Sequence, residues 1–308
     1  MNVLVTGAGG FIGGHLVEHL VKQGCTVTAV SRRPRMAGLR CRWLSTPQMD
    51  LSADWAPLLA GIDSVVHLAG LAHSRAAASS VVYQQRLQRI NVDTTAALYR
   101  DSSRCGIGRF LFVSSIAALT SRSVGQLTAA TPAKPSTPYG KSKLAAERAI
   151  EFGYPTWGCP YTILRPPVIY GRGNPANMHA LMQLIRSGVP LPFRSLTNRR
   201  SILYVENLCD VIYRCLTTPA AANQTFLVSD GCDLSTPELI CHIATAAKVP
   251  CRLFAFPEGI LRFASRFNPD DSLAKLTGSL YLDIEPLKRS LSWTPLFSVS
   301  QGLARTLI

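Results

Sequence analysis

A chain of 308 residues with 47% hydrophobic and 16% charged side chains is long enough to bury a full core and too apolar to be disordered. Its apolar runs stay below the ~20 residues that a membrane-spanning helix requires. The net charge of +14 predicts an anionic partner: a nucleic acid, an acidic lipid or a phosphorylated small molecule. The arginines are spread along the chain without a nucleic-acid-binding signature, so charge alone leaves this choice open.

The first residues, MNVLVTGAGGFIGG, have no basic leader and turn into glycines. We therefore expect no signal peptide and a cytoplasmic location. Nine cysteines, scattered without a Cys-x-x-Cys pair, predict reduced thiols rather than a disulfide framework or a zinc site. His15 and His19 have no third ligand at a familiar spacing, so we assign no metal site.

Strands and helices alternate along the first part of the chain. Residues 2–24 predict a strand, a glycine turn and a helix that ends at Gly24. Apolar runs predict further strands at 26–33, 63–70, 109–115 and 161–171, with helices over 89–106 and from Tyr139 onward. This βαβ alternation predicts an α/β fold, a Rossmann-type doubly wound parallel sheet with helices on both faces.

Beyond Gly171 the alternation loosens. The pattern predicts a polar loop, a helix and a proline-rich exit over 171–193, then a strand and a helix over 201–219, a strand over 224–230 and short helices from Leu234. We expect a dinucleotide-binding domain over 1–170, with a return segment at about 200–230. A smaller mixed α/β domain is expected over 171–199 and 231–308.

The segment TGAGGFIG places Gly7, Gly10 and Gly13 between a strand and a helix. Glycines here permit a tight turn, and the helix N-terminus offers N–H groups to a pyrophosphate. After the second strand, where NAD-binding folds usually carry an acid, this chain has Arg32 and Arg33. Arginine suits the 2′-phosphate of NADP, so we expect NADP(H), with NAD(H) as the alternative.

Tyr139 and Lys143 stand four residues apart at the start of a predicted helix, after Pro135 and Pro138. Residues at this spacing share a helix face, so both polar ends can reach one point. Taken alone, the pair is equally compatible with a packed tyrosine and a solvated lysine.

The segments TGAGGFIG, VVHLAG and FVSS, followed by Tyr139-x-x-x-Lys143, together resemble the extended short-chain dehydrogenase/reductase family, in its nucleotide-sugar epimerase, dehydratase and reductase branch. The likeness covers essentially the whole chain. It implies that Tyr139 is the general acid or base, that Lys143 lowers its pKa and holds the nicotinamide ribose, and that Ser115 bonds the reacting sugar oxygen.

The same resemblance implies which residues contact the ligands. The segment RRSILYVENL matches Arg200 to an arginine that grips a nucleotide-sugar diphosphate, and GNPANM matches Asn177 to an asparagine nearby. His73 matches a histidine near the sugar. The expected dinucleotide contacts are Gly7, Gly10, Phe11, Ile12, Gly13, Arg32, Arg33, Asp50, Leu51, Leu68, Ala69, Gly70, Tyr139, Lys143 and Pro166.

The segments RPPVIYGRGNPANM, GVPLPF and LTGSLYLD resemble bacterial enzymes of O-antigen (lipopolysaccharide) sugar synthesis. We therefore expect an NADPH-dependent reductase for the C4 carbonyl of a UDP-4-keto-6-deoxy-N-acetylhexosamine. A UDP-sugar 4-epimerase with tightly bound NAD is the alternative, because the same three catalytic residues serve both reactions. A dehydratase fits less well, since Ile116 and Ala117 stand where its acid pair would be.

A non-catalytic reading is a dinucleotide-binding sensor or a nucleic-acid-associated protein. The intact set of Ser115, Tyr139 and Lys143 argues against it, so we expect a UDP-sugar substrate and no nucleic acid. The resemblance also implies a homodimer. No stable membrane insertion is expected, although the segment GILRFASRF leaves contact with an acidic surface open.

Overall fold

The computed structural model describes residues 1–32, 41–45, 54–71, 80–174, 177–265 and 272–307. Among the predicted site residues, Arg33, Asp50, Leu51 and His73 lie outside the described residues. Asn177 begins a helix, but its side chain lies outside them as well.

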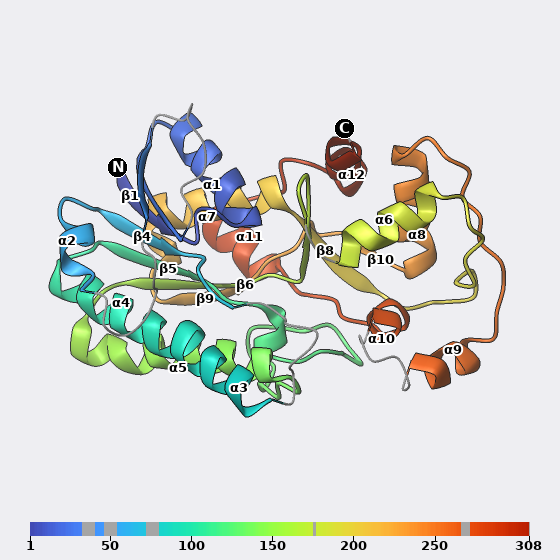
Figure 1. Ribbon diagram of the computed structural model, residues 1–308, viewed down its shortest axis with the longest axis horizontal. Helices are drawn as coiled ribbons and strands as arrows, with labels where there is room; N and C mark the ends of the chain where they lie inside the picture. The colour runs from blue at the N-terminus through green and yellow to red at the C-terminus, as the bar shows by residue number, and fades with distance from the viewer. Residues whose placement is uncertain (33–40, 46–53, 72–79, 175–176, 266–271, 308) are drawn as a thin grey trace.

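A seven-stranded, wholly parallel sheet forms the centre of the molecule (Figure 1). Val3 and Val5 of its first strand point into one core and Leu4 into the other, which is why this strand is apolar throughout. The predicted Rossmann-type fold is confirmed. In spatial order the strands are β3 (Arg42–Ser45), β2 (Thr26–Ser31), β1 (Asn2–Thr6), β4 (Ser64–His67), β5 (Arg109–Val113), β6 (Tyr161–Arg165) and β9 (Gln224–Leu227).

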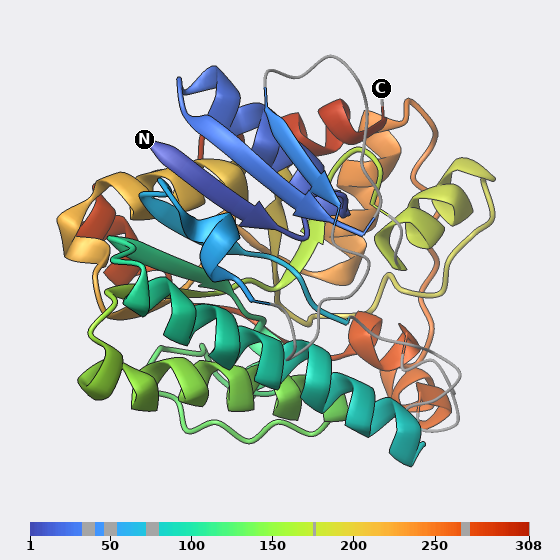
Figure 2. The same ribbon diagram turned by 60° about the vertical axis from the view of Figure 1, so that its left-hand side comes forward.

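Helices cover both faces of this sheet, as Figures 1 and 2 show. One face carries α1 (Phe11–Lys22), α7 (Val205–Thr217) and α11 (Glu285–Leu291). The other carries α3 (Val81–Leu87), α4 (Thr94–Arg104) and α5 (Pro138–Trp157). The shorter elements are α2 (Ala56–Leu59), the π-helix η1 (Gln88–Asp93) and the 3-10 helices η2 (Ile116–Ala118) and η3 (Pro219–Ala221).

A second sheet of three strands, in the order β10-β8-β7, begins what we call the C-terminal lobe. Its strands are β7 (Val168–Tyr170), β8 (Arg200–Tyr204) and β10 (Asp233–Leu234). Its helices are α6 (Asn177–Arg186), α8 (Thr236–Ala246), α9 (Glu258–Ala264), α10 (Ser272–Thr277) and α12 (Val299–Leu307). Among the described residues, no helix has both the length and the apolar character needed to cross a bilayer.

Two expected elements are divided in the structure. The strand predicted over 161–171 breaks at Pro166 and Pro167, so that β6 stays in the large sheet and β7 joins the small one. Proline has no N–H for a sheet ladder, which explains the break. The return segment predicted at about 200–230 is divided between the two sheets. Its first strand, β8, lies in the small sheet, whereas α7 packs on α1 and β9 joins the large sheet. The domain boundaries therefore stay a prediction.

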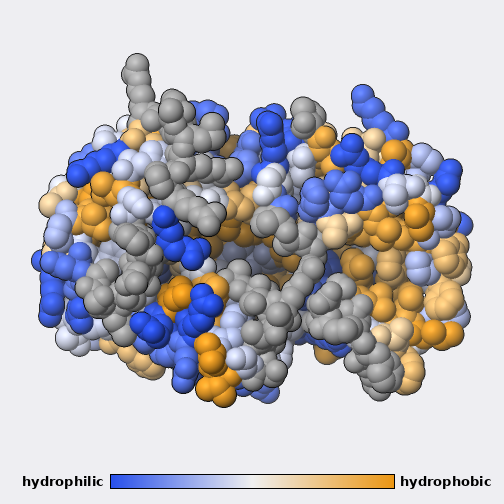
Figure 3. All heavy atoms as spheres, in the orientation of Figure 1, coloured by the Kyte–Doolittle hydropathy of each residue, from blue (hydrophilic) through white to orange (hydrophobic). Residues whose placement is uncertain are grey.

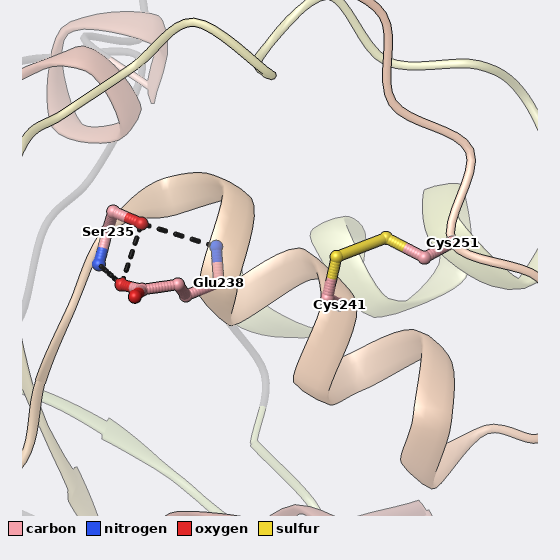
Figure 4. Close-up of a disulfide and its surroundings, with 4 residues drawn as sticks. All are labelled: Ser235, Glu238, Cys241 and Cys251. Carbon is pink, nitrogen blue, oxygen red and sulfur yellow. Dashed lines mark hydrogen bonds between the residues drawn. A yellow bond between two sulfur atoms is a disulfide. The ribbon is translucent and has the colours of Figure 1, made fainter.

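The expectation that all nine cysteines are reduced is wrong, because Cys241 of α8 forms a disulfide with Cys251 (Figure 4). A capping box of Ser235 and Glu238 begins α8. After the helix the chain turns back through Lys248, whose φ is +57°, and brings the two cysteine Cα atoms to 5.3 Å. That separation lies within the usual disulfide range. The other seven cysteines are free.

Candidate active site

The turn between β1 and α1 is built from glycines at positions where a side chain would not fit. Gly7 has a φ of +71°, and a Cβ there would lie 2.7 Å from the backbone nitrogen of Ala69. A Cβ at Gly13 would lie 2.6 Å from the Cα of Ala8, so α1 begins directly against the turn. Within the described part of the chain, no side chain caps α1 at Gly10, and its first turn contains no acid. This cradle fits a dinucleotide pyrophosphate.

The glycine turn faces the residues that follow β4. The order of the large sheet reverses between β1 and β4, the place where open α/β sheets bind ligands at the carboxyl ends of their strands. Gly7 contacts Leu68 and Ala69 there. A Cβ at Gly70 would lie 3.6 Å from the Nζ of Lys143. The fold thus gathers these predicted cofactor residues at the carboxyl ends of β1 and β4, a place that we call the crevice.

Three further predicted cofactor residues lie close to this crevice. Phe11 and Ile12 form the first turn of α1 and pack against the larger core. Pro166 follows β6 and is buried, and its carbonyl accepts a hydrogen bond of 2.9 Å from the backbone N–H of Ile116. This bond ties the end of β6 to the segment after β5.

Ser115 and Tyr139 come from different elements and meet. Ser115 follows β5 in extended conformation, and its Oγ accepts the N–H of Ala117 at 3.2 Å. Thr137 caps α5 by accepting the N–H of Gly140 at 3.0 Å. Because Gly140 has no side chain, the first turn of α5 packs against the carbonyl of Ala117. The hydroxyl of Tyr139 therefore reaches Ser115 and is hydrogen-bonded to it.

Lys143 lies buried one turn further along α5. Its ammonium donates a hydrogen bond of 3.0 Å to the carbonyl of Val113 and lies 4.5 Å from the ring centroid of Phe112. Burial lowers the pKa of Lys143 to about 8, and the negative charge of Glu147 opposes that shift. Lys143 is therefore mostly protonated at neutral pH.

The expectation that Lys143 lowers the pKa of Tyr139 is not met. Burial raises the pKa of Tyr139 to about 12, the hydrogen bond with Ser115 opposes the shift, and Tyr83 adds to it. The physical reason is that the Lys143 ammonium is directed to the end of β5. In this structure Tyr139 is a neutral phenol at physiological pH.

Asn91 holds the crevice together, and it was not among the site residues predicted from the sequence. Its Oδ1 accepts the N–H of Leu71 at 2.7 Å, and its Nδ2 donates to the Leu71 carbonyl at 3.1 Å and to the Oγ of Ser142 at 2.9 Å. Asn91 thus joins the segment after β4 to α5. In the sequence, the feature that could have identified Asn91 is a polar residue inside a helical pattern with apolar neighbours. The structure places Asn91 in the π-helix η1.

A second missed group lies beneath the glycine turn. The fully buried His67 hydrogen-bonds through Nδ1 to Thr6 at 2.6 Å and through Nε2 to Thr95 at 3.0 Å. Burial, with a smaller effect from the Lys143 charge, lowers the pKa of His67 to about 3. A neutral imidazole therefore connects β1, β4 and α4.

A buried ion pair completes the support of the site. Glu147 is fully buried, and its Oε2 lies 2.6 Å from an Nη2 of Arg165, which is 8% exposed. Ser114 donates its hydroxyl to the same carboxylate. The three residues join α5 and β6 to the segment after β5, one residue before Ser115. The spacing of Glu147 four residues after Lys143 was the signal in the sequence.

The residues expected at the ligand's outer ends belong to other elements. Arg200 begins β8 in the C-terminal lobe and donates from Nη1 to the carbonyl of Gly278 at 3.1 Å. Asn177 begins α6 of the same lobe. Arg32 is exposed directly after β2.

Comparison with known proteins agrees with this geometry. A profile described as the NAD dependent epimerase/dehydratase family matches residues 3–229. A UDP-glucose 4-epimerase of Vibrio cholerae is 32% identical over 316 residues, covering 99% of this chain and 94% of that protein. The N-acetyl-alpha-D-glucosaminyl-diphospho-ditrans,octacis-undecaprenol 4-epimerase of Escherichia coli O157:H7 is 27% identical, with coverage of 99% and 94%. The solved structure of MoeE5 with UDP-glucuronic acid and NAD superimposes with a TM-score of 0.79 at 26% identity, covering 100% of this chain and 98% of that one.

Proposed function

Since the chain belongs to the NAD-dependent epimerase/dehydratase family, we propose that it is a nucleotide-sugar 4-epimerase that works with NAD. One observation carries the proposal: Ser115 and Tyr139 are hydrogen-bonded to each other beside Lys143, at the crevice that the glycine turn opens. A 4-epimerase is favoured over the expected 4-keto-sugar reductase, because the sequence is 32% identical to a UDP-glucose 4-epimerase over 99% of its length.

The substrate class follows from what the relatives share. The names of the Vibrio cholerae and Escherichia coli relatives both describe epimerisation at C4 of a hexose, and the hexose is attached to a diphosphate in both substrates. We infer a UDP-hexose as the substrate here. Arg200, whose guanidinium suits bidentate contact with a diphosphate, would anchor it from the C-terminal lobe together with Asn177.

Each catalytic residue has a separate task in this proposal. Ser115 holds the C4 oxygen, and Tyr139 takes the proton of the C4 hydroxyl and later returns it. Because burial raises the pKa of Tyr139 to about 12, the tyrosine needs added positive charge beside it to act as the base. Lys143 would bind the ribose at the crevice. When bound, oxidised NAD would supply that positive charge beside Tyr139 and would accept and return the C4 hydride.

A 4-reductase remains the second candidate, and Arg32 is the observation that favours it. Arg32 is exposed at the end of β2, where an acid would select NAD and an arginine suits NADP. The two reactions differ in cofactor balance, because an epimerase recovers its cofactor in every turnover and a reductase consumes NADPH.

The test uses the purified protein. Nucleotide released on denaturation is identified as NAD or NADP, and the native protein is incubated with UDP-glucose or UDP-N-acetylglucosamine. The 4-epimer, formed without net cofactor consumption and lost in Tyr139→Phe but not in the matched control Tyr154→Phe on the same helix, would support the epimerase. Stoichiometric NADPH oxidation with a UDP-4-keto-6-deoxy-N-acetylhexosamine, and no epimer from either UDP-sugar, would overturn it in favour of the reductase.

A further inference from the structure

The C-terminal lobe exposes large apolar side chains on α9 and on the segment before it. Phe254, Ile260 and Phe263 are 44%, 53% and 59% exposed, whereas Leu261, on the inner side of α9, is 6% exposed. The helix is therefore anchored by its inner side and presents aliphatic and aromatic groups to the solvent. Two large exposed apolar side chains on one short helix, with a third on the segment before it, are typical of a surface that another molecule covers.

A second element extends the same surface. Val124 is 106% exposed, and its loop and α9 enclose a hollow of about 670 Å³. Figure 3 shows hydrophobic side chains gathered over the C-terminal lobe, on its right-hand side. We call α9, Phe254 and the Val124 loop together the α9 face. The lining of the hollow comes from residues 122–124, from α9 and from residues 277–279.

The charged groups around the α9 face are mainly positive. Arg122 and Arg262 line the hollow, whose described lining contains no acid. Arg194 and Arg252 are both exposed. Arg252 lies two residues before Phe254, and the backbone N–H of Arg194 donates to the carbonyl of Phe254. The acid that the structure shows here is Glu258, which pairs with Arg262 at 2.6 Å. Asp270 and Asp271 follow α9 in the sequence and lie outside the described residues.

We propose that the α9 face docks on an anionic lipid bilayer. Ile260, Phe263 and Val124 enter the headgroup region, and the surrounding arginines contact lipid phosphates. Apolar groups interspersed with cations match an acidic bilayer surface, and the net charge of +14 adds long-range attraction to it. A second copy of the chain fits less well, because a two-fold interface would place this cationic face against itself.

Vesicle flotation tests the proposal and does not depend on the enzymatic activity. The full-length protein should float with vesicles of phosphatidylcholine and phosphatidylglycerol, and much less with phosphatidylcholine alone. Ile260→Glu combined with Phe263→Glu should lower the partition coefficient by at least about tenfold, and Val124→Glu should lower it independently. Added salt should weaken binding of the wild type.

Leu296→Glu is the matched control. Leu296 is 53% exposed and lies between α11 and α12, and Figure 1 places α12 and α9 at opposite edges of the C-terminal lobe. This variant should bind vesicles as the wild type does, and thermal melting verifies that every variant is folded. Absence of wild-type binding to anionic vesicles, or equal binding by the α9-face variants, would overturn the proposal. A dimer in sedimentation velocity that the double variant dissociates, without vesicle binding, would assign the face to self-association instead.

Discussion

Replacing Glu147 by glutamine tests whether the buried ion pair holds the catalytic elements together. The fully buried carboxylate accepts hydrogen bonds from Arg165 at 2.6 and 3.0 Å and from the hydroxyl of Ser114. Glutamine keeps the shape but removes the charge, so the 8%-exposed guanidinium of Arg165 loses its counter-ion. Removing one partner of a buried pair costs about 3–5 kcal/mol, because the other charge stays buried without compensation.

Thermal unfolding measures this cost. For a chain of 308 residues, a loss of that size corresponds to a fall in Tm of about 5–8 °C. Glu285→Gln is the matched control, since Glu285 is 61% exposed and pairs with Lys288 at 2.8 Å on the surface. An exposed pair contributes at most about 1 kcal/mol. If Glu147→Gln and Glu285→Gln melt at the same temperature, the reasoning about the buried pair is refuted.

The same substitution should also move the pH dependence of the proposed reaction. Glu147 opposes the effect of burial on Lys143, so its neutralisation lowers the Lys143 pKa below about 8. The alkaline limb of kcat/KM, which we assign to loss of the Lys143 charge, should then shift to lower pH. Glu147→Asp keeps a negative charge, so its alkaline limb should lie closer to the wild-type pH than that of Glu147→Gln. An unchanged alkaline limb would show that the charge of Glu147 does not set the pKa of Lys143. The prediction about the melting temperature would be unaffected.

Three further outcomes follow from the site. Tyr139→Phe should lower kcat, measured in steady-state assays, by a factor of about 10²–10⁴ and leave the melting curve unchanged. A variant that retains a tenth of the wild-type activity would exclude Tyr139 as the acid or base. Gly13→Ala should abolish NAD retention, measured by the nucleotide content of the purified protein, because the new Cβ would lie 2.6 Å from the Cα of Ala8; full retention would contradict the cradle. Burial lowers the pKa of His67 from 6.5 in the unfolded chain to about 3 in the folded protein. As the pH falls below 6.5, the unfolded chain binds the proton before the folded protein does, so the free energy of unfolding decreases, by about 2 kcal/mol at pH 5 relative to pH 7. Denaturant titrations of His67→Gln should show a shallower slope between pH 7 and 5 than the wild type, and an equal slope would refute this assignment.

Local patterns were enough to predict the central fold. The apolar run of β1, the glycine turn and the periodic α1 follow one another within 22 residues, so short-range sterics and side-chain period specify them. The spacing of Tyr139 and Lys143 places both on one side of α5 for the same reason. The order of these segments along the chain also indicated the family that the profile match shows.

Contacts between distant segments decided the rest, because burial and partner geometry depend on packing and not on neighbours in the sequence. Asn91 meets Leu71 only through the π-helix, and Cys241 meets Cys251 only because the chain turns back after α8. The pKa of Tyr139 is the clearest case. The resemblance to the family implied that Lys143 lowers this pKa, but Lys143 donates its hydrogen bond to Val113, and desolvation of the phenol raises the pKa of Tyr139 to about 12.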